Sequence, residues 1–153
     1  MAAARNVPRY PGWTEHARAV LSRSGHRSGE ARAAVIELLG QQRCCLSAQE
    51  IFDALRHARR PVGFATVYRV LDVLLQRGLI QRVDLGGVAR YEPALASGEH
   101  HHHLVCDDCG RVEPFADAPL ERALERVGGG LEYEIGAHDV VLRGSCVDCR
   151  ATG

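Results

Sequence analysis

The sequence predicts an α+β protein, with an N-terminal winged helix-turn-helix domain followed by a small α/β domain that holds a structural zinc ion. Three observations lead to this fold class. Helical apolar patterns fill the first half and end in two short strands, the charge changes sign between the halves, and two Cys-x-x-Cys pairs lie in the second half. The 153 residues suffice for one ordinary domain or two small ones.

The first half is expected to be helical. Apolar residues recur at helical spacing over 14–23, over 28–40, from Ser47 to before Pro61, and over 64–77. The third segment opens with Ser-Ala-Gln-Glu, a capping-box pattern in which Ser47 and Glu50 cap the helix together. Two strands, 79–84 and 88–92, follow around a turn at Gly86 and Gly87. The last three of these helices, followed by the hairpin, are typical of a winged helix.

The charge pattern places a boundary near residue 92. Residues 1–90 have 14 arginines and 7 acidic residues, whereas residues 91–153 have 5 arginines and 12 acidic residues. We therefore expect a flexible tail at 1–13, a winged-helix domain at 14–92, a linker at 93–99 and an α/β domain at 100–153. The basic half suits a polyanionic partner, although chance patterning of solvated faces gives the same asymmetry.

The sequence gives no indication of a membrane or secreted protein. No apolar run approaches the ~18 residues that a membrane span needs, and residues 1–13 lack the apolar core of a secretory signal. We therefore expect a cytoplasmic protein, in which cysteines stay reduced and paired Cys-x-x-Cys motifs bind metal.

The helix at 64–77 is the candidate for DNA recognition. In helix-turn-helix proteins the later helix enters the major groove. The side of this helix that faces away from the core offers Thr66, Tyr68 and Arg69, which suit contacts with phosphate, thymine methyl groups and guanine. The alternative is a plain helical bundle with a solvated arginine.

The second half has the ligands for metal. We expect strands at 102–106 and 111–115, a helix at 118–127, and a longer strand pair or one bent strand over 131–143. Two Cys-x-x-Cys turns can complete a tetrahedron around one ion, and four thiolates leave no open position for catalysis. The four ligands are Cys106, Cys109, Cys146 and Cys149. The alternative is a redox dithiol or disulfide pair, which a cytoplasmic chain disfavours.

The run of four histidines at 100–103 offers further metal ligands. In an extended segment His100 and His102 face one way, and His101 and His103 face the other. Two metal sites can therefore form, each completed by residues from elsewhere in the chain. The candidates for those positions are Glu121, His138, Glu92 and Cys45. The run is neither terminal nor long, so we do not interpret it as a purification tag.

Together these motifs resemble the ferric uptake regulator superfamily of bacterial metal-sensing repressors. The resemblance extends from about Arg27 to Cys149. It depends on GFATVYRVLDVL at 63–74, HHHHLVCDDCG at 100–110 and CVDC at 146–149. It implies a metal-dependent repressor of metal homeostasis genes, with a winged-helix domain and a C-terminal α/β dimerisation domain. A homodimer is expected to bind a palindromic operator in double-stranded DNA, with no small-molecule substrate and no membrane partner.

The resemblance also implies residue roles. The two Cys-x-x-Cys pairs match the family's structural zinc site. The regulatory hinge site matches Cys45, Glu92, His101 and His103. The second regulatory site matches His100, His102, Glu121 and His138. The DNA-binding positions match Tyr68 and Arg69 on the recognition helix, together with Arg32.

The identity of the regulatory metal depends on the ligands of the hinge site. The position of Cys45 is often histidine in iron and peroxide sensors of the family. A thiolate there is softer and favours Zn²⁺ over Fe²⁺ or Mn²⁺. The alternative within the family is an iron-dependent peroxide sensor, which Glu92, His101 and His103 permit. A metal-dependent hydrolase is the alternative from another class, but no general-base carboxylate lies within a known histidine motif and the deaminase signature is absent. We therefore do not expect an enzyme.

Overall fold

The computed structural model describes residues 10–25, 29–95 and 100–152. The chain divides into two compact units, which we call the N-terminal unit (Pro8–Glu99) and the C-terminal unit (mainly His100–Gly153). Each combines helices with a three-stranded sheet, so the α+β fold class is confirmed. Of the predicted linker, residues 96–99 lie outside the described residues, and Pro93 is the last residue of a strand. None of the helices in the described ranges is long and apolar enough to cross a membrane.

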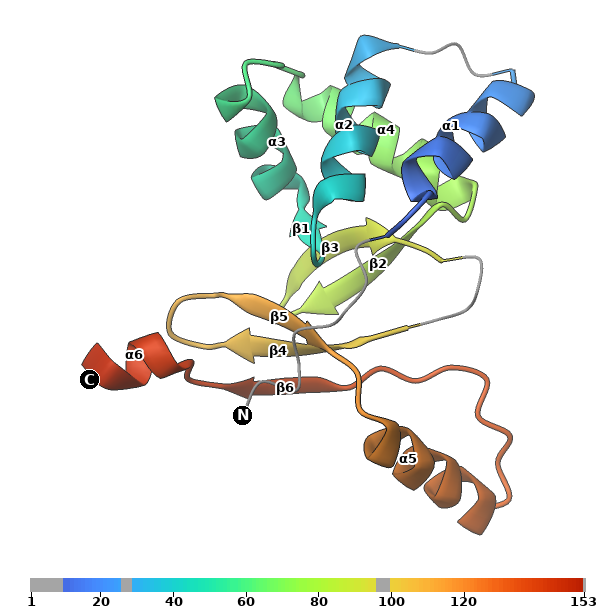
Figure 1. Ribbon diagram of the computed structural model, residues 1–153, viewed down its shortest axis with the longest axis vertical. Coiled ribbons are helices and arrows are strands. Elements are labelled where there is room, and N and C mark those ends of the chain that lie inside the picture. The colour runs from blue at the N-terminus through green and yellow to red at the C-terminus, as the bar shows by residue number, and fades with distance from the viewer. Residues whose placement is uncertain (1–9, 26–28, 96–99, 153) are drawn as a thin grey trace. The chain divides into compact units, whose positions relative to one another are not determined.

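Four helices and a three-stranded sheet form the N-terminal unit (Figure 1). The helices are α1 (Trp13–Arg23), α2 (Glu30–Gln41), α3 (Ala48–His57) and α4 (Phe64–Gln76), and the strands are β1 (Leu46–Ser47), β2 (Ile80–Leu85) and β3 (Val88–Pro93). The sheet order is β1-β3-β2, with both pairs antiparallel. The wing predicted from the sequence is the β2–β3 hairpin. Its turn uses Gly86 and Gly87 with φ of 63° and 80°, the left-handed conformation that tight hairpins require.

The apolar faces of the four helices meet in one core. Each helix places its buried residues at helical spacing, as α4 does with Val67, Val70, Leu71 and Leu74. The predicted capping box begins α3: the Glu50 amide donates to Ser47 Oγ over 3.1 Å, and the Ser47 amide donates to the Glu50 carboxylate over 2.8 Å.

The prediction of a flexible tail over residues 1–13 is wrong for its last residues. Tyr10 and Trp13 are buried in the core, and the Trp13 indole donates to the Leu79 carbonyl over 2.8 Å. Because the partner lies 66 residues away, no local pattern indicates this anchor. Residues 1–9 lie outside the described part of the chain.

Helix α2 continues one residue beyond Gly40, the end of the helical segment predicted over 28–40. A Cβ atom at Gly40 would approach Thr14 Oγ1 to 2.2 Å, so the glycine permits close contact between α1 and α2. The same helices are joined by an ion pair between Glu37 and Arg18, and Glu37 also pairs with Arg60 beyond α3. The hydrogen bond from Arg60 outweighs the effect of burial and lowers the pKa of Glu37.

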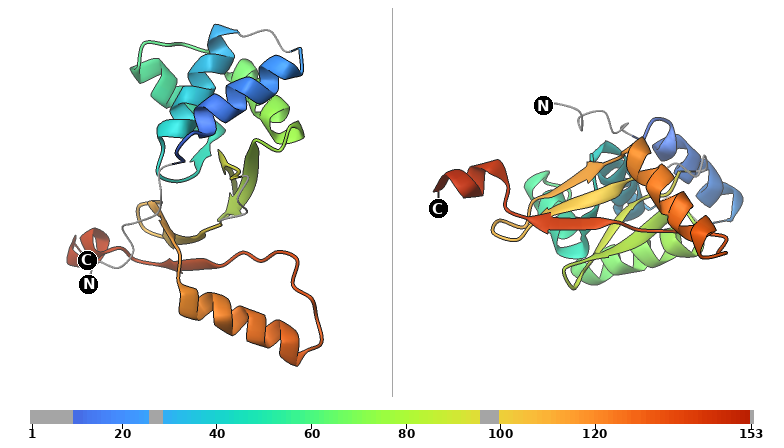
Figure 2. Two further views of the ribbon diagram at one scale, coloured as in Figure 1. Left: turned by 45° about the vertical axis from the view of Figure 1, so that its right-hand side comes forward. Right: turned by 90° about the horizontal axis from the view of Figure 1, so that it is seen from below.

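The C-terminal unit is built on the sheet β5-β4-β6. Strand β4 (His102–Cys106) pairs antiparallel with β5 (Val112–Phe115) and parallel with β6 (Val141–Gly144). Helix α5 (Ala118–Gly130) leads from β5 into a long connection to β6, and α6 (Val147–Thr152) ends the unit (Figures 1 and 2).

The strand predicted over 131–143 is mostly wrong. Only Val141–Gly144 is a strand, and residues 133–140 have no regular structure. Leu131, Tyr133 and Ile135 alternate as in a strand, but their side chains are 66%, 72% and 47% exposed. The alternation therefore does not correspond to a buried face within a single copy of the unit.

Candidate metal centres

The four cysteines of the two Cys-x-x-Cys pairs converge at one end of the C-terminal sheet. Cys106 ends β4, Cys109 follows in the turn, Cys146 precedes α6 and Cys149 lies within it. Their Sγ atoms all lie within 4.8 Å of one another, and the Cys106–Cys149 and Cys109–Cys146 pairs are each 3.9 Å apart. A tetrahedral zinc site with Zn–S bonds of about 2.3 Å has edges of about 3.8 Å. The site therefore fits zinc, and all six cysteines of the chain are free thiols.

Local interactions hold this cluster ready for a cation. The Cys146 amide donates to Cys106 Sγ over 3.3 Å, and this hydrogen bond is the main reason that the pKa of Cys106 falls to about 6. Each Cys-x-x-Cys turn also contains an aspartate in an ion pair: Asp107 with Arg143, and Asp148 with Arg111 over 2.9 Å. These pairs tie both turns to the sheet, and the sequence reasoning did not identify them.

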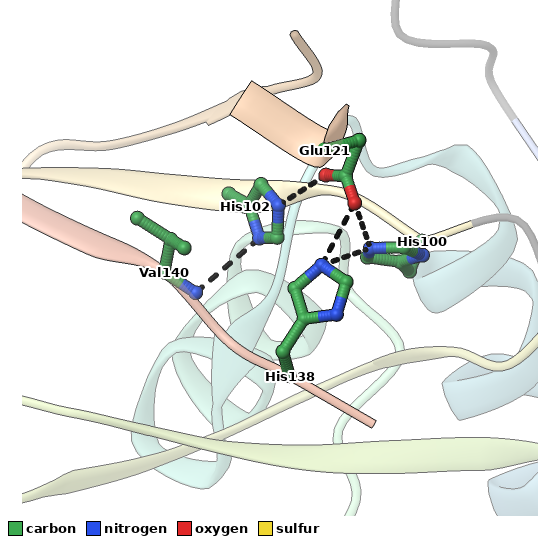
Figure 3. A network of polar contacts seen from close by, with 5 residues as sticks. All are labelled: His100, His102, Glu121, His138 and Val140. Atoms are coloured by element: carbon green, nitrogen blue, oxygen red, sulfur yellow. Dashed lines mark hydrogen bonds and ion pairs between the residues drawn. The ribbon is translucent and has the colours of Figure 1, made fainter. Parts of the chain in front are cut away.

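The second cluster joins three segments of the C-terminal unit (Figure 3). His102 begins β4 and His100 lies just before it, Glu121 comes from the first turn of α5, and His138 comes from the connection to β6. Nε2 of His102 lies 2.6 Å from Oε1 of Glu121, and Nε2 of His138 lies 2.8 Å from Oε2. Nε2 of His100 lies 3.4 Å from the same Oε2 and 3.1 Å from Nε2 of His138.

Three imidazoles around one carboxylate fit a divalent metal ion. Tetrahedral bonds of about 2.1 Å give edges of about 3.4 Å, so these ligand atoms need to separate by less than about 1 Å. Burial opposes ionisation of Glu121, but hydrogen bonds from His102 and His138 outweigh it and lower its pKa. The Val140 amide donates to Nδ1 of His102 over 3.3 Å, which leaves the proton of the neutral ring on Nε2. Metal binding at Nε2 of the neutral ring would require that proton to move to Nδ1, which would end the hydrogen bond from Val140.

The residues predicted for the hinge site divide between the two units. In the N-terminal unit, the Cys44 Sγ and a Glu92 carboxylate oxygen lie within 4.8 Å of each other. Gln81 donates to Glu92 Oε1 over 2.6 Å. In the C-terminal unit, ligand nitrogens of His101 and His103 lie within 4.8 Å, with ring centroids 4.9 Å apart.

Cys44, and not the predicted ligand Cys45, belongs to the group of possible metal ligands that includes Glu92. Cys45 is 3% exposed and its Sγ lies 3.7 Å from that of Cys44, which is partly exposed. The hydrogen bond with Cys44, followed by burial, raises the pKa of Cys45. The sequence reasoning did not consider Cys44 as a ligand, although the adjacent pair of cysteines was visible.

Three of the predicted DNA-binding residues lie together near the start of α4. Tyr68 and Arg69 are exposed and Thr66 is half-buried. Phe64, which the sequence reasoning missed, is exposed and packs edge-on against Tyr68 with ring centroids 5.2 Å apart. An apolar residue at the first exposed position of the helix was the signal that could have identified it.

Arg32 lies on a different helix from the other three. It is half-buried on α2 and lines a cavity of about 240 Å³ together with Arg18 and Ser22 of α1. Its role in DNA binding therefore stays a prediction from the resemblance.

The comparisons with known proteins agree on one family. The sequence model described as the ferric uptake regulator family matches residues 23–143. The chain is 38% identical over 121 residues to the ferric uptake regulation protein of Legionella pneumophila, covering 78% of this chain and 88% of that protein. It is 40% identical over 107 residues to that of Cupriavidus metallidurans, covering 68% and 73%.

Solved structures give the same result. The Vibrio cholerae ferric uptake regulator superposes with a TM-score of 0.74 at 31% identity, covering 84% of this chain and 98% of that one. The Helicobacter pylori ferric uptake regulator superposes with a TM-score of 0.79 at 26% identity, covering 94% and 97%. The latter structure is described as having three functional metal binding sites.

Proposed function

Because the chain belongs to the ferric uptake regulator family, whose members are DNA-binding, metal-binding transcription regulators and not enzymes, we propose that it is a metal-dependent repressor of metal homeostasis genes. It acts in the cytoplasm as a homodimer on a palindromic operator. The observation that carries this proposal is that the N-terminal unit holds both an exposed recognition helix and possible metal ligands at Cys44 and Glu92.

The N-terminal unit supplies DNA recognition. Helix α4 presents Tyr68 and Arg69 to solvent beside Thr66, in the position from which helix-turn-helix proteins contact base edges. Arg32 supplies a further contact, which we place on the DNA backbone. The excess of 14 arginines over 7 acidic residues in residues 1–90 adds a favourable, salt-dependent attraction to phosphate.

Metal binding at the hinge is coupled to DNA binding. We propose that Glu92 and a thiolate from the N-terminal unit bind one divalent ion together with His101 and His103 of the C-terminal unit. The thiolate ligand is Cys45 by the family pattern. Such an ion favours one arrangement of the two units, and a dimer needs its recognition helices about 34 Å apart to reach successive turns of DNA. The ion shifts this equilibrium only by its difference in affinity for the two arrangements.

The ligand chemistry favours zinc as the regulatory ion. A ligand set of one thiolate, two imidazoles and one carboxylate is softer than the nitrogen and oxygen ligands that suit Fe²⁺ or Mn²⁺. A structural Zn²⁺ at the four cysteines is separate from this regulatory ion, because four thiolates leave no open position. An Fe²⁺-dependent peroxide sensor is the second candidate, and Glu92 with the two histidines is the observation that favours it.

The homodimer is supported by apolar surface on the C-terminal unit. Leu131, Tyr133 and Ile135 alternate along the connection after α5, and all three are exposed. Val141 and Leu142 of β6 are also exposed, by 37% and 47%. Large apolar side chains that stay exposed suit a surface that another protein covers, and a second copy of the unit is the occupant we propose.

The test uses the full chain with zinc retained only at the four cysteines. Binding duplexes are first selected from a randomised DNA pool with Zn²⁺ present. The affinity for an enriched duplex is then measured with Zn²⁺, Mn²⁺ and, without oxygen, Fe²⁺. We expect Zn²⁺ to strengthen binding by about 5–150-fold, the usual range of coupling between two sites. A response to Fe²⁺ alone supports the peroxide sensor, and an affinity unchanged by every ion contradicts the proposal.

A further inference from the structure

Two adjacent cysteines lie outside the four-cysteine cluster. Cys44 and Cys45 belong to the short segment between α2, which ends at Gln41, and β1, which begins at Leu46 (Figure 1). Their Sγ atoms are 3.7 Å apart, so the two sulfurs touch. Because the two residues are neighbours in the chain, their thiols stay close together when other parts of the unit move. The pair therefore meets the first requirement for a disulfide, which is proximity.

The two metal sites proposed above do not account for both thiols of this pair. The structural zinc site is complete with its own four thiolates, and the proposed hinge site uses one thiolate from the pair. The second thiol has no role in either site. A reaction that joins the two sulfurs removes the hinge thiolate, whether Cys44 or Cys45 is the ligand. The pair therefore offers a means of control that a single cysteine at the hinge does not.

The two thiols differ in their access to solvent. Cys44 is partly exposed, whereas Cys45 is buried. A small oxidant in solution therefore reaches Cys44 first. A hydroperoxide converts an accessible cysteine to a sulfenic acid, which condenses with a nearby thiol to form a disulfide. The buried Cys45 sulfur, already in contact with Cys44, is placed to act as that second thiol.

We propose that Cys44 and Cys45 form a redox switch, in which a hydroperoxide converts the two thiols to a reversible disulfide and so removes the hinge thiolate. The inference rests on the proposed function in taking that thiolate as a regulatory ligand. The Cys44 sulfur attacks one peroxide oxygen, the O–O bond breaks, and an alcohol or water leaves. The Cys45 sulfur then attacks the Cys44 sulfenic acid, the S–O bond breaks, and water leaves. The sulfurs lose two electrons in total, and the peroxide gains them.

Oxidation leaves the hinge site with too few ligands. The thiolate is the form of cysteine that binds metal, and a disulfide sulfur is not a substitute for it. Of the proposed hinge ligands, Glu92, His101 and His103 remain. The affinity of the hinge for a thiophilic ion such as Zn²⁺ therefore falls. The oxidised protein should lose its zinc-dependent DNA binding for this reason.

The position of the pair in the chain makes the disulfide easy to reverse. Neighbouring Cα atoms are about 3.8 Å apart across a trans peptide bond, which is less than the roughly 4.4 Å at which ordinary disulfides begin. A disulfide between adjacent residues is therefore strained, and strained disulfides are readily reduced. Residues 42–45 lie outside helices and strands, so the backbone there can adjust to the new bond. Cellular dithiols can then restore both thiols once the oxidant is gone.

Peptide mass after oxidation tests the disulfide. The full-length protein, with zinc at its four cysteines and none at the hinge, is treated with hydrogen peroxide, labelled with N-ethylmaleimide under denaturing conditions and digested with trypsin. Cleavage after Arg43 and Arg56 releases a peptide that contains Cys44, Cys45 and no other cysteine. In the treated protein we expect this peptide to lose two hydrogen atoms and to take up no label. In the untreated protein, or after dithiothreitol, it should take up two labels.

Single substitutions separate the roles of the two thiols. In Cys45→Ser, the sulfenic acid at Cys44 lacks its partner and should be captured by dimedone. In Cys44→Ser, the buried Cys45 should stay unmodified at the same dose of peroxide. The proposal is overturned if the peptide from the treated wild type keeps both labels. It is also overturned if either thiol is joined instead to a cysteine of the zinc cluster.

DNA affinity of the same samples tests the consequence of oxidation. The strengthening of DNA binding by zinc, about 5–150-fold in the reduced protein, should disappear in the oxidised protein and return after dithiothreitol. A disulfide that leaves this zinc response unchanged means that the switch fails and the proposed function stands. A reduced protein without any zinc response means that the proposed function fails, and the peptide mass alone then decides whether the disulfide forms.

Discussion

Replacing one ligand of the four-cysteine cluster is expected to unfold the C-terminal unit and leave the N-terminal unit intact. Cys149→Ser is the most informative change, because Cys149 lies in α6 and its Sγ lies 3.9 Å from that of Cys106. Serine removes a soft thiolate while nearly keeping the shape of the side chain. The remaining three thiolates leave one coordination position open to water.

The expected size of the effect follows from how little else stabilises this unit. Val105, Pro114 and Phe115 are its main buried apolar side chains apart from cysteine. A fully buried apolar side chain contributes about 1.5–3 kcal/mol. A structural zinc ion contributes about 10–16 kcal/mol of apparent binding free energy, all of which stabilises the folded state. Zinc therefore dominates the stability of the unit, and a large loss of zinc affinity unfolds it.

Two measurements on the same sample check this prediction. Zinc that survives dialysis against a chelator should fall from about one ion per chain to none. Hydrogen exchange should become fast across β4–β6 while α2 and α4 keep their protection. Cys45→Ser is the control, because Cys45 lies outside the four-cysteine cluster. If Cys149→Ser keeps its zinc and slow exchange in β4, the reasoning is refuted.

Three further predictions concern other parts of the molecule. The pKa of Glu37 is lowered mainly by its hydrogen bond with Arg60, so its stabilising effect is present above the unfolded pKa of about 4.3 and is lost as the pH falls through the lower folded value. Glu37→Gln should therefore lower the free energy of unfolding, measured by denaturant titration, by about 0.5–1 kcal/mol at pH 7 and leave it unchanged at pH 2. An equal loss at both pH values contradicts a stabilising role of the ion pairs. Tyr133→Glu should convert the dimer to a monomer in sedimentation equilibrium, and an unchanged dimer contradicts the proposed surface. With Co²⁺ at the hinge, the sulfur-to-metal charge-transfer band should disappear in Cys45→Ser if Cys45 is the ligand, as the family pattern implies. The band should instead disappear in Cys44→Ser if Cys44 is the ligand.

Local chemistry explains which parts of the fold could be predicted from the sequence. The capping box at Ser47 and Glu50 and the glycine turn of the wing depend on residues close in the chain, and both are present. The anchor of Trp13 on the Leu79 carbonyl joins residues far apart, so no local pattern reveals it. The strand expected over 131–143 is a different error, because there the local pattern is present and the expected structure is not. Alternation at Leu131 and Tyr133 predicts a buried face but does not say which molecule covers it.

The candidate sites show the same limit. Spacing alone identified the two Cys-x-x-Cys pairs, because each pair lies in a single turn and four thiolates suit one ion. Spacing also separated the histidines into two sets, since alternate residues of an extended segment face opposite ways. Spacing alone could not tell whether Cys44 or Cys45 is the hinge ligand. The backbone between α2 and β1 determines which thiol can share an ion with Glu92. Phe64 was missed because its exposure depends on how α4 packs against α2 and α3.

The measurement that tests the central claim most directly is the zinc dependence of DNA affinity in hinge variants. Fluorescence anisotropy with a selected duplex compares the wild type with the double variant His101→Ala, His103→Ala. Glu125→Gln, which alters an exposed carboxylate of α5 outside all three candidate metal clusters, is the control. The account predicts that zinc strengthens binding at least about 5-fold in the wild type and in the control and has no effect on the double variant. An equal zinc response in the double variant would contradict the hinge as the sensing site.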